Sequence, residues 1–134
     1  MFQEIPGLEE LVSYFAKNGI QTCILYGSAG SSRFSEKSDI DLAVAAENRL
    51  SYDDLVRYYL KAVELLQREV DIKDLRTVQG VLLKEILTTG KILINKDHTF
   101  LGTKAVEMMD FQTDLAPQVN AMLKTRLEKA AYGK

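Results

Sequence analysis

Residues 26–44 decide the fold of this chain, and they read Y-G-S-A-G-S-S-R-F-S-E-K-S-D-I-D-L-A-V. An apolar run ends at their start in Gly27-Ser28, and a second apolar run carries Asp39 and Asp41 with one residue between them. Side chains alternate between the two faces of a strand, so residues two apart project from the same side, about 6.6–6.8 Å apart. We therefore expect the two aspartates to lie side by side, while the apolar residues between and after them face a core.

The aspartate pair predicts a metal site. Two carboxylates aimed at one place repel each other, and a bound divalent cation removes that repulsion. Hard cations such as Mg²⁺, or Mn²⁺ in its place, prefer carboxylate oxygen. Asp39 and Asp41 are therefore the first candidate metal ligands.

Gly27 and Ser28 predict a phosphate-binding turn ahead of that pair. The small residues that follow them are typical of a turn from a strand into a helix. Glycine lets the backbone approach a ligand closely, free N–H groups at a helix start attract phosphate oxygens, and the Ser28 hydroxyl adds a donor. A phosphate cradle followed by a metal-binding pair suits displacement at a nucleotide phosphorus, where metal ions clamp the attacking and leaving oxygens.

Either half of this pattern alone has an ordinary explanation, because most Gly-Ser pairs are turns and most Asp-x-Asp pairs are solvated strand ends. Here ten residues separate Ser28 from Asp39, with an apolar run on each side. This spacing resembles the signature of the nucleotidyltransferase superfamily that includes DNA polymerase beta and kanamycin nucleotidyltransferase. The fuller run G-S-A-x-x-x-R-x-x-x-x-S-D-I-D-L-A-V, in so short a chain, resembles the minimal nucleotidyltransferases, the MNT partners of HEPN ribonucleases.

The resemblance implies an α+β nucleotidyltransferase fold, with a small mixed sheet of about four strands flanked by helices. It also implies a third carboxylate on a neighbouring strand, which either completes the metal site or activates the attacking hydroxyl. Asp71 has the required phase, because Val70 and Ile72 on either side of it are apolar. Asp74 is the alternative third carboxylate, although a regular strand turns it the other way and it suits the cap of a following helix. Lys73 shares the face of Asp71 and is a further candidate for a phosphate contact.

Two loop residues are further candidates for binding the nucleotide. Arg33 resembles an arginine of the family's loop, although it lies later than usual and follows serine, so a solvated loop cation is the competing interpretation. Ser38 directly precedes Asp39, where a hydrogen bond within the loop competes with a nucleotide contact.

Composition places the chain among ordinary globular proteins. Its 134 residues are 46% hydrophobic and 27% charged, which predicts one domain with a real core. The net charge of −2 argues against direct nucleic-acid binding. The single cysteine, Cys23, lies in an apolar run and predicts no disulfide framework. No signal peptide or apolar segment of membrane-spanning length is evident, so we expect a cytoplasmic protein without a membrane partner.

Periodicity divides the chain into a core over residues 1–96 and a helical C-terminal extension of the same domain over residues 97–134. Strands are predicted over residues 20–26, 39–45 and 91–95, with a further one around Asp71. A first helix is predicted from the stripe Leu8, Leu11, Val12 and Phe15, and a second from Ser51 with the stripe Leu55, Tyr59, Ala62, Val63 and Leu66. A third carries Val78, Leu82, Glu85 and Ile86. The extension is predicted to be helical from about residue 98 to 115 and, beyond Pro117, to about residue 132.

The resemblance implies an ATP-dependent adenylyltransferase that acts as an antitoxin. Its acceptor would be a tyrosine hydroxyl of a cognate HEPN ribonuclease toxin, which the modification inactivates. In that reaction Asp39, Asp41 and Asp71 would hold metal, while Gly27, Ser28, Arg33 and Ser38 would contact the nucleotide. Two alternatives remain open: an antitoxin that neutralises its toxin by binding alone, and a nucleotidyltransferase that modifies a small molecule. The Arg-x4-His signature of the toxin is absent from this chain.

Overall fold

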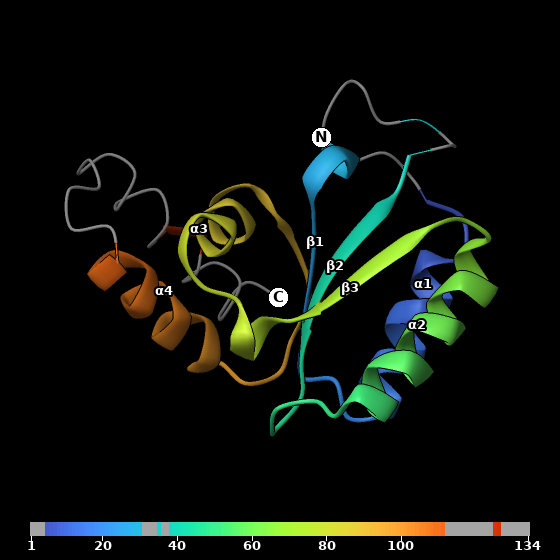
Figure 1. Ribbon diagram of the computed structural model, residues 1–134, viewed down its shortest axis with the longest axis horizontal. Coiled ribbons are helices and arrows are strands. Elements are labelled where there is room, and N and C mark those ends of the chain that lie inside the picture. Colours follow the sequence, from blue (N-terminus) through green and yellow to red (C-terminus); the bar gives the residue numbers. More distant parts are fainter. Residues whose placement is uncertain (1–4, 31–34, 36–37, 112–124, 127–134) are drawn as a thin grey trace.

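A computed structural model describes residues 5–30, 35, 38–111 and 125–126 (Figure 1). Helices and strands alternate along the chain in the order α1 (Leu8–Lys17), β1 (Thr22–Tyr26), η1 (Gly27–Gly30), β2 (Ile40–Ala45), α2 (Tyr52–Leu66), β3 (Val70–Asp74), η2 (Leu75–Thr77), α3 (Gly80–Thr89), β4 (Lys91–Asn95) and α4 (Phe100–Phe111). The two η elements are short 3₁₀ helices. The predicted strands are confirmed, with β1 and β2 beginning one or two residues later than expected.

In the described part of the chain, four strands form one mixed sheet in the order β3-β2-β1-β4. β1 pairs antiparallel with both β2 and β4, and β3 pairs parallel with β2. The connection from β1 to β2 is too short for a crossover helix and gives an antiparallel pair, whereas α2 provides the crossover that a parallel β2–β3 pair requires. The predicted α+β fold with a small mixed sheet is confirmed.

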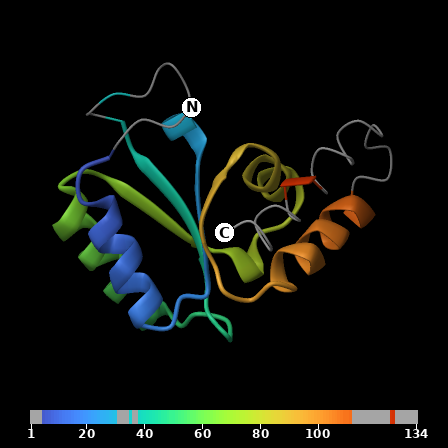
Figure 2. The ribbon, with the colours of Figure 1, turned by 180° about the vertical axis from the view of Figure 1, so that it is seen from behind.

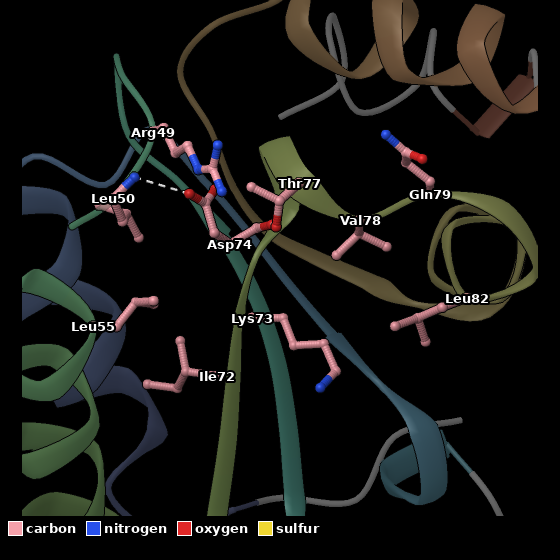
Figure 3. Close-up of a pocket in the computed structure, with 10 residues that line it drawn as sticks. All are labelled: Arg49, Leu50, Leu55, Ile72, Lys73, Asp74, Thr77, Val78, Gln79 and Leu82. Carbon is pink, nitrogen blue, oxygen red and sulfur yellow. Dashed lines mark hydrogen bonds between the residues drawn. The ribbon is translucent and has the colours of Figure 1, made fainter. Parts of the chain in front are cut away.

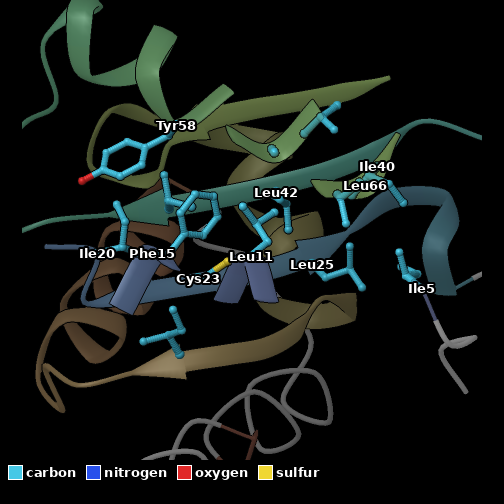
Figure 4. Close-up of a cluster of buried hydrophobic side chains, with 14 of the residues drawn as sticks. Ile5, Leu11, Phe15, Ile20, Cys23, Leu25, Ile40, Leu42, Tyr58 and Leu66 are labelled. Carbon is cyan, nitrogen blue, oxygen red and sulfur yellow. The ribbon is translucent and has the colours of Figure 1, made fainter. Parts of the chain in front are cut away.

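Helices cover both faces of this sheet. Helices α1 and α2 lie on one face, and α3 and α4 lie on the other (Figures 1 and 2). Strand alternation separates two cores accordingly, since Leu42 packs with the α1–α2 cluster while Ala43 packs with the α3–α4 cluster. Figure 4 shows the first cluster, where Leu11 and Phe15 of α1 lie against the sheet.

Helix α2 begins as predicted but faces the core differently. The Ser51 hydroxyl accepts from the Asp54 N–H at 3.0 Å, and Asp54 reciprocates toward the Ser51 N–H, which forms a capping box. The predicted core position of Tyr59 is wrong. Tyr58 is buried instead, where its hydroxyl donates to the Asn18 carbonyl and its ring packs against Phe15, while Tyr59 is 36% exposed.

The predicted third helix is confirmed as α3, which contains Leu82, Glu85 and Ile86 and begins two residues after Val78. Leu83, Ile86 and Leu87 are buried, whereas Leu82 is half-buried and Glu85 is exposed.

Helix α4 begins at Phe100, two residues after the predicted start. The Asp97 carboxylate accepts from the N–H and the hydroxyl of Thr99, which holds a turn before the helix. Pro117 and most of the predicted extension lie outside the described residues. Arg126 is described, and its guanidinium donates to the carbonyls of Leu87 and Gly90 at the end of α3. None of the described helices has the length and apolar character needed to cross a membrane.

Candidate active site

The turn after β1 brings the backbone of Gly27 against Asp41. Gly27 has a φ of +76°, a conformation that L side chains rarely adopt. A Cβ added there would lie 2.3 Å from Oδ2 of Asp41, far inside van der Waals contact. Glycine at this position is therefore required both by the backbone conformation and by the carboxylate beside it. The predicted strand-to-helix turn is a short 3₁₀ helix, with Ser28 half-buried in it.

Three polar side chains form a row across the sheet at this end. Asp41 of β2 lies opposite Tyr26 of β1 on one side and opposite Asp71 of β3 on the other. Residues directly opposite each other in neighbouring strands share a face, with the strands about 4.7–4.9 Å apart. The register thus places Asp71 beside Asp41, as its phase predicted.

Asp74, the alternative third carboxylate, lies on the other face. It is opposite Val44 in the register and 5% exposed. Its carboxylate accepts from the N–H of Leu50 at 2.8 Å and from the N–H of Arg76 at 3.0 Å. Asp74 therefore caps η2 and anchors the loop before α2, which leaves Asp71 as the aspartate next to Asp41.

Asp39 lies immediately before β2 and is exposed. The strand was predicted to include it, but the β2–β3 ladder begins one residue later, where the Ile40 N–H donates to the Glu69 carbonyl at 3.0 Å. On its other side, the Ser38 carbonyl accepts from Nε and Nη2 of Arg68 at 3.2 and 2.9 Å. Arg68 and Glu69, which follow α2, thus bind the residues on either side of Asp39 and fix its backbone position.

The row carries a concentration of negative charge. Burial raises the pKa of the Asp41 carboxyl, and the charges of Asp71, Asp39 and Glu85 raise it further, against an opposing effect of Lys73. Burial also raises the pKa of the Tyr26 hydroxyl, with the charges of Asp41, Asp71 and Glu85 acting in the same direction. Ionised carboxylates in this setting are stabilised by a cation placed among them.

The donor set fits a hard divalent cation, because it consists of carboxylate oxygens that are close in the register and mutually repelling. Within the described residues, no three His, Cys, Asp or Glu side chains are already gathered as a metal cluster. Asp71 instead pairs with Lys73, whose Nζ lies 3.1 Å from Oδ2 of Asp71. A cation would therefore compete with this ammonium group for Asp71.

The remaining predicted residues are placed only in part. Arg33 lies outside the described residues. The Ser38 hydroxyl accepts from the Ser35 N–H at 3.0 Å, so it forms the hydrogen bond within the loop that was one of its two interpretations. Its contact with a nucleotide stays a prediction.

Three residues of this region were missed as site residues by sequence reasoning: Arg68, Tyr26 and Glu85. Arg68 lies three positions before Asp71, and a cation that close to the third carboxylate is the one sequence signal that marks it. Tyr26 was missed because its position opposite Asp41 depends on the register between β1 and β2, which the sequence does not give. Glu85 lies on α3, and its charge acts on Asp41 and Tyr26, although the sequence pattern indicated only that it lies on a helix.

Comparisons with known proteins identify the family to which the chain belongs. A family model described as polymerase beta, nucleotidyltransferase matches residues 9–99. The protein adenylyltransferase MntA of Shewanella oneidensis is 33% identical over 93 residues, which span 66% of this chain and 66% of that protein.

Two solved structures share the fold. A toxin–antitoxin crystal structure with AMP-PNP contains a chain that is 25% identical, with a TM-score of 0.66, covering 90% of this chain and 96% of the other. An MNT antitoxin in complex with a tri-AMPylated Shewanella oneidensis HEPN toxin gives 24% identity and a TM-score of 0.64, with coverage of 90% and 96%. At that identity the second likeness concerns the fold alone.

Proposed function

Because this chain belongs to the polymerase beta nucleotidyltransferase family, we propose that it is an antitoxin that transfers AMP from ATP to a tyrosine hydroxyl of a HEPN ribonuclease toxin. The single observation that carries the proposal is the packing of Gly27 against Asp41, with Asp71 next to it in the register. This arrangement supports the proposal, because the turn that we propose to bind phosphate lies against one of two neighbouring carboxylates. The named activity of the Shewanella relative supports AMP as the transferred group.

In this reaction the chain's residues position the nucleotide and accept a proton. Backbone N–H groups of the turn that begins at Gly27, together with the Ser28 hydroxyl, bind the triphosphate, and Arg33 and Ser38 make further contacts from the loop. Asp39, Asp41 and Asp71 would hold Mg²⁺, or Mn²⁺ in its place. When bound, the metal supplies charge stabilisation on the entering and leaving oxygens.

The chemical step is a displacement at the α-phosphorus. The tyrosine oxygen forms a bond to that phosphorus as the bond to the pyrophosphate oxygen breaks, and pyrophosphate leaves. The phenolic proton passes to the Asp71 carboxylate, which is 51% exposed and therefore open to an incoming acceptor. Asp41, which is more buried at the centre of the row, is suited to holding charge in place.

The test is AMP transfer by a variant that keeps the shape of the site. Asp39→Asn with Asp41→Asn nearly preserves side-chain volume while replacing two charged ligands with neutral amides. Loss of comparable electrostatic stabilisation costs about 10²–10³-fold in rate. Asp53→Asn is the matched control, since Asp53 is an exposed aspartate in the first turn of α2.

Intact-mass spectrometry of the HEPN partner, incubated with Mg²⁺ and ATP, provides the measurement. Wild type and Asp53→Asn should add an AMP-sized increment to a partner tyrosine and silence its ribonuclease activity. The double variant should bind the partner and leave it unmodified. If the double variant protects cells from the toxin as well as wild type does, neutralisation by binding alone replaces the enzymatic proposal.

A further inference from the structure

We propose that the free edge of β3 is the docking site for an extended, acidic segment of the acceptor protein, the segment that carries the tyrosine to be modified. The proposal rests on the proposed function, because it assigns the route by which that protein reaches Asp71. Three features of the edge support it: the shape of a groove, the direction of the backbone N–H and C=O groups, and the charge of the residues that line the groove.

A groove of about 480 Å³ follows this edge. Figure 3 shows β3 running through it, with Leu50, Leu55 and Ile72 on one side and residues of η2 and α3 on the other. The groove is lined by five apolar side chains from elements on both faces of the sheet, together with five polar or charged ones: Arg49, Leu50, Leu55, Ile72, Lys73, Asp74, Thr77, Val78, Gln79 and Leu82. Walls of this kind accommodate the alternating side chains of an extended segment.

The backbone of β3 offers hydrogen bonds toward this groove. The Ile40 N–H donates to the Glu69 carbonyl, so the parallel ladder to β2 uses residues 69, 71 and 73 of this stretch. The N–H and C=O of Ile72 therefore point away from β2, at the edge where the described residues provide no further strand. A free edge of this kind pairs readily with an extended segment from another chain.

The charge of the groove favours an acidic occupant. Asp74 is its one carboxylate, and that carboxylate already accepts two backbone N–H groups. Arg49 is exposed and forms no hydrogen bond or ion pair with any described residue. Lys73 lies in the middle of the groove with its side chain 38% exposed (Figure 3). Arg49, which is exposed, and Lys73, which pairs with Asp71 outside the lining of the groove, are together complementary to a segment that carries a carboxylate.

Lys73 connects the groove to the reaction site. Its Nζ is 3.1 Å from Oδ2 of Asp71, the carboxylate assigned to take the acceptor's proton. An acidic side chain in the groove would draw this ammonium group away and free Asp71 for the incoming hydroxyl. Docking and activation of the acceptor would then be coupled through one side chain.

Two substitutions test the docking site by different means. Ile72→Pro removes the outward N–H without touching the ladder to β2, and proline is tolerated at such edge positions. Arg49→Glu replaces a cation that lines the groove with an anion. Lys17→Glu is its matched control, because Lys17 is an exposed cation at the end of α1. Neither position belongs to the proposed nucleotide or metal site, so Mg-ATP affinity measured by calorimetry should stay within about twofold of wild type.

The dissociation constant for the HEPN partner and the KM for it as acceptor should each rise at least about tenfold in Ile72→Pro, the equivalent of one or two lost hydrogen bonds. In Arg49→Glu both should rise and the dependence of binding on salt should weaken, while Lys17→Glu should match wild type. The kcat at saturating partner should change little in both groove variants.

Unchanged partner affinity and KM in a folded Ile72→Pro would overturn the docking site, and if that variant does not fold, unchanged values in Arg49→Glu would do so. A change of oligomeric state in either variant, seen by light scattering, would assign the groove to a second copy of this chain instead. Partner binding is measured without turnover. If wild type transfers no AMP at all, the proposed function fails while the binding data still decide the groove.

Discussion

Replacing Gly27 with alanine should disturb both the stability and the chemistry of the site, by amounts that can be separated. The first cost is the backbone, since an L residue at a φ of +76° is strained by roughly 1–2 kcal/mol. The second is the contact of the new Cβ with Oδ2 of Asp41 at 2.3 Å. Turning the Asp41 side chain away from it costs about 0.5–1.5 kcal/mol if an off-rotamer angle results. We expect the free energy of unfolding to fall by roughly 2–3 kcal/mol in total.

A double-mutant cycle with Asp41→Ala isolates the second cost. Without the carboxylate, the alanine Cβ at position 27 meets the Cβ of residue 41 at 3.4 Å, an ordinary contact. In that background Gly27→Ala should cost only the backbone strain, about 1–2 kcal/mol in urea unfolding. Gly102→Ala is the control, because its Cβ meets nothing within 4 Å and alanine favours helix α4.

AMP transfer by Gly27→Ala should fall about 10²-fold, the scale expected when a catalytic group is displaced by about 1 Å. Two results would refute this reasoning. One is an equal stability cost in both backgrounds, which would mean that Asp41 does not meet the new methyl group. The other is AMP transfer at the wild-type rate by a folded variant, which would mean that close approach at residue 27 is not needed.

Two further predictions concern the same site. The raised pKa of Asp41 means that the folded protein binds a proton there more tightly than the unfolded chain does, so the free energy of unfolding should fall as pH rises through the unfolded pKa and up to the folded one. Urea titrations in chelator from about pH 4 to about pH 7 should show a flatter profile for Asp41→Asn, and an unchanged profile would contradict the assignment. Arg68→Met should raise the Mg²⁺ concentration needed for half-maximal AMP transfer, because the carbonyl next to Asp39 loses its clamp, whereas Arg57→Met on the exposed face of α2 should not. Equal Mg²⁺ dependence in both variants would remove the positioning role of Arg68.

The parts of the site that sequence reasoning predicted are those that depend on local spacing. Strand alternation gave the phase of Asp71 and turned Asp74 to the other face, and the register confirms both placements. The capping residue Ser51 was predicted correctly for the same reason, since its partner is three residues away. Whether Asp39, Asp41 and Asp71 bind metal stays a prediction.

The parts that were missed depend on partners far apart in sequence. Tyr58 rather than Tyr59 is buried because the hydroxyl of Tyr58 reaches Asn18, a contact that helical periodicity does not contain. The guanidinium of Arg68 reaches Ser38 across thirty positions. Periodicity within a strand or helix does not predict which distant carbonyl a side chain will bind. These contacts are therefore seen only in the folded structure.

The fold holds two like charges side by side, because Asp41 lies opposite Asp71 in the register. On the other face of the same strand, Ile40, Leu42 and Val44 are fully buried in the cluster with α1 and α2. Each such side chain stabilises the fold by roughly 1.5–3 kcal/mol through burial, which is ample against the repulsion of a half-exposed carboxylate pair. Strand β2 is therefore fixed by its apolar face, and the residues of its polar face are free to be chosen for chemistry. This division explains how β2 can hold Asp41 opposite Asp71 in the register.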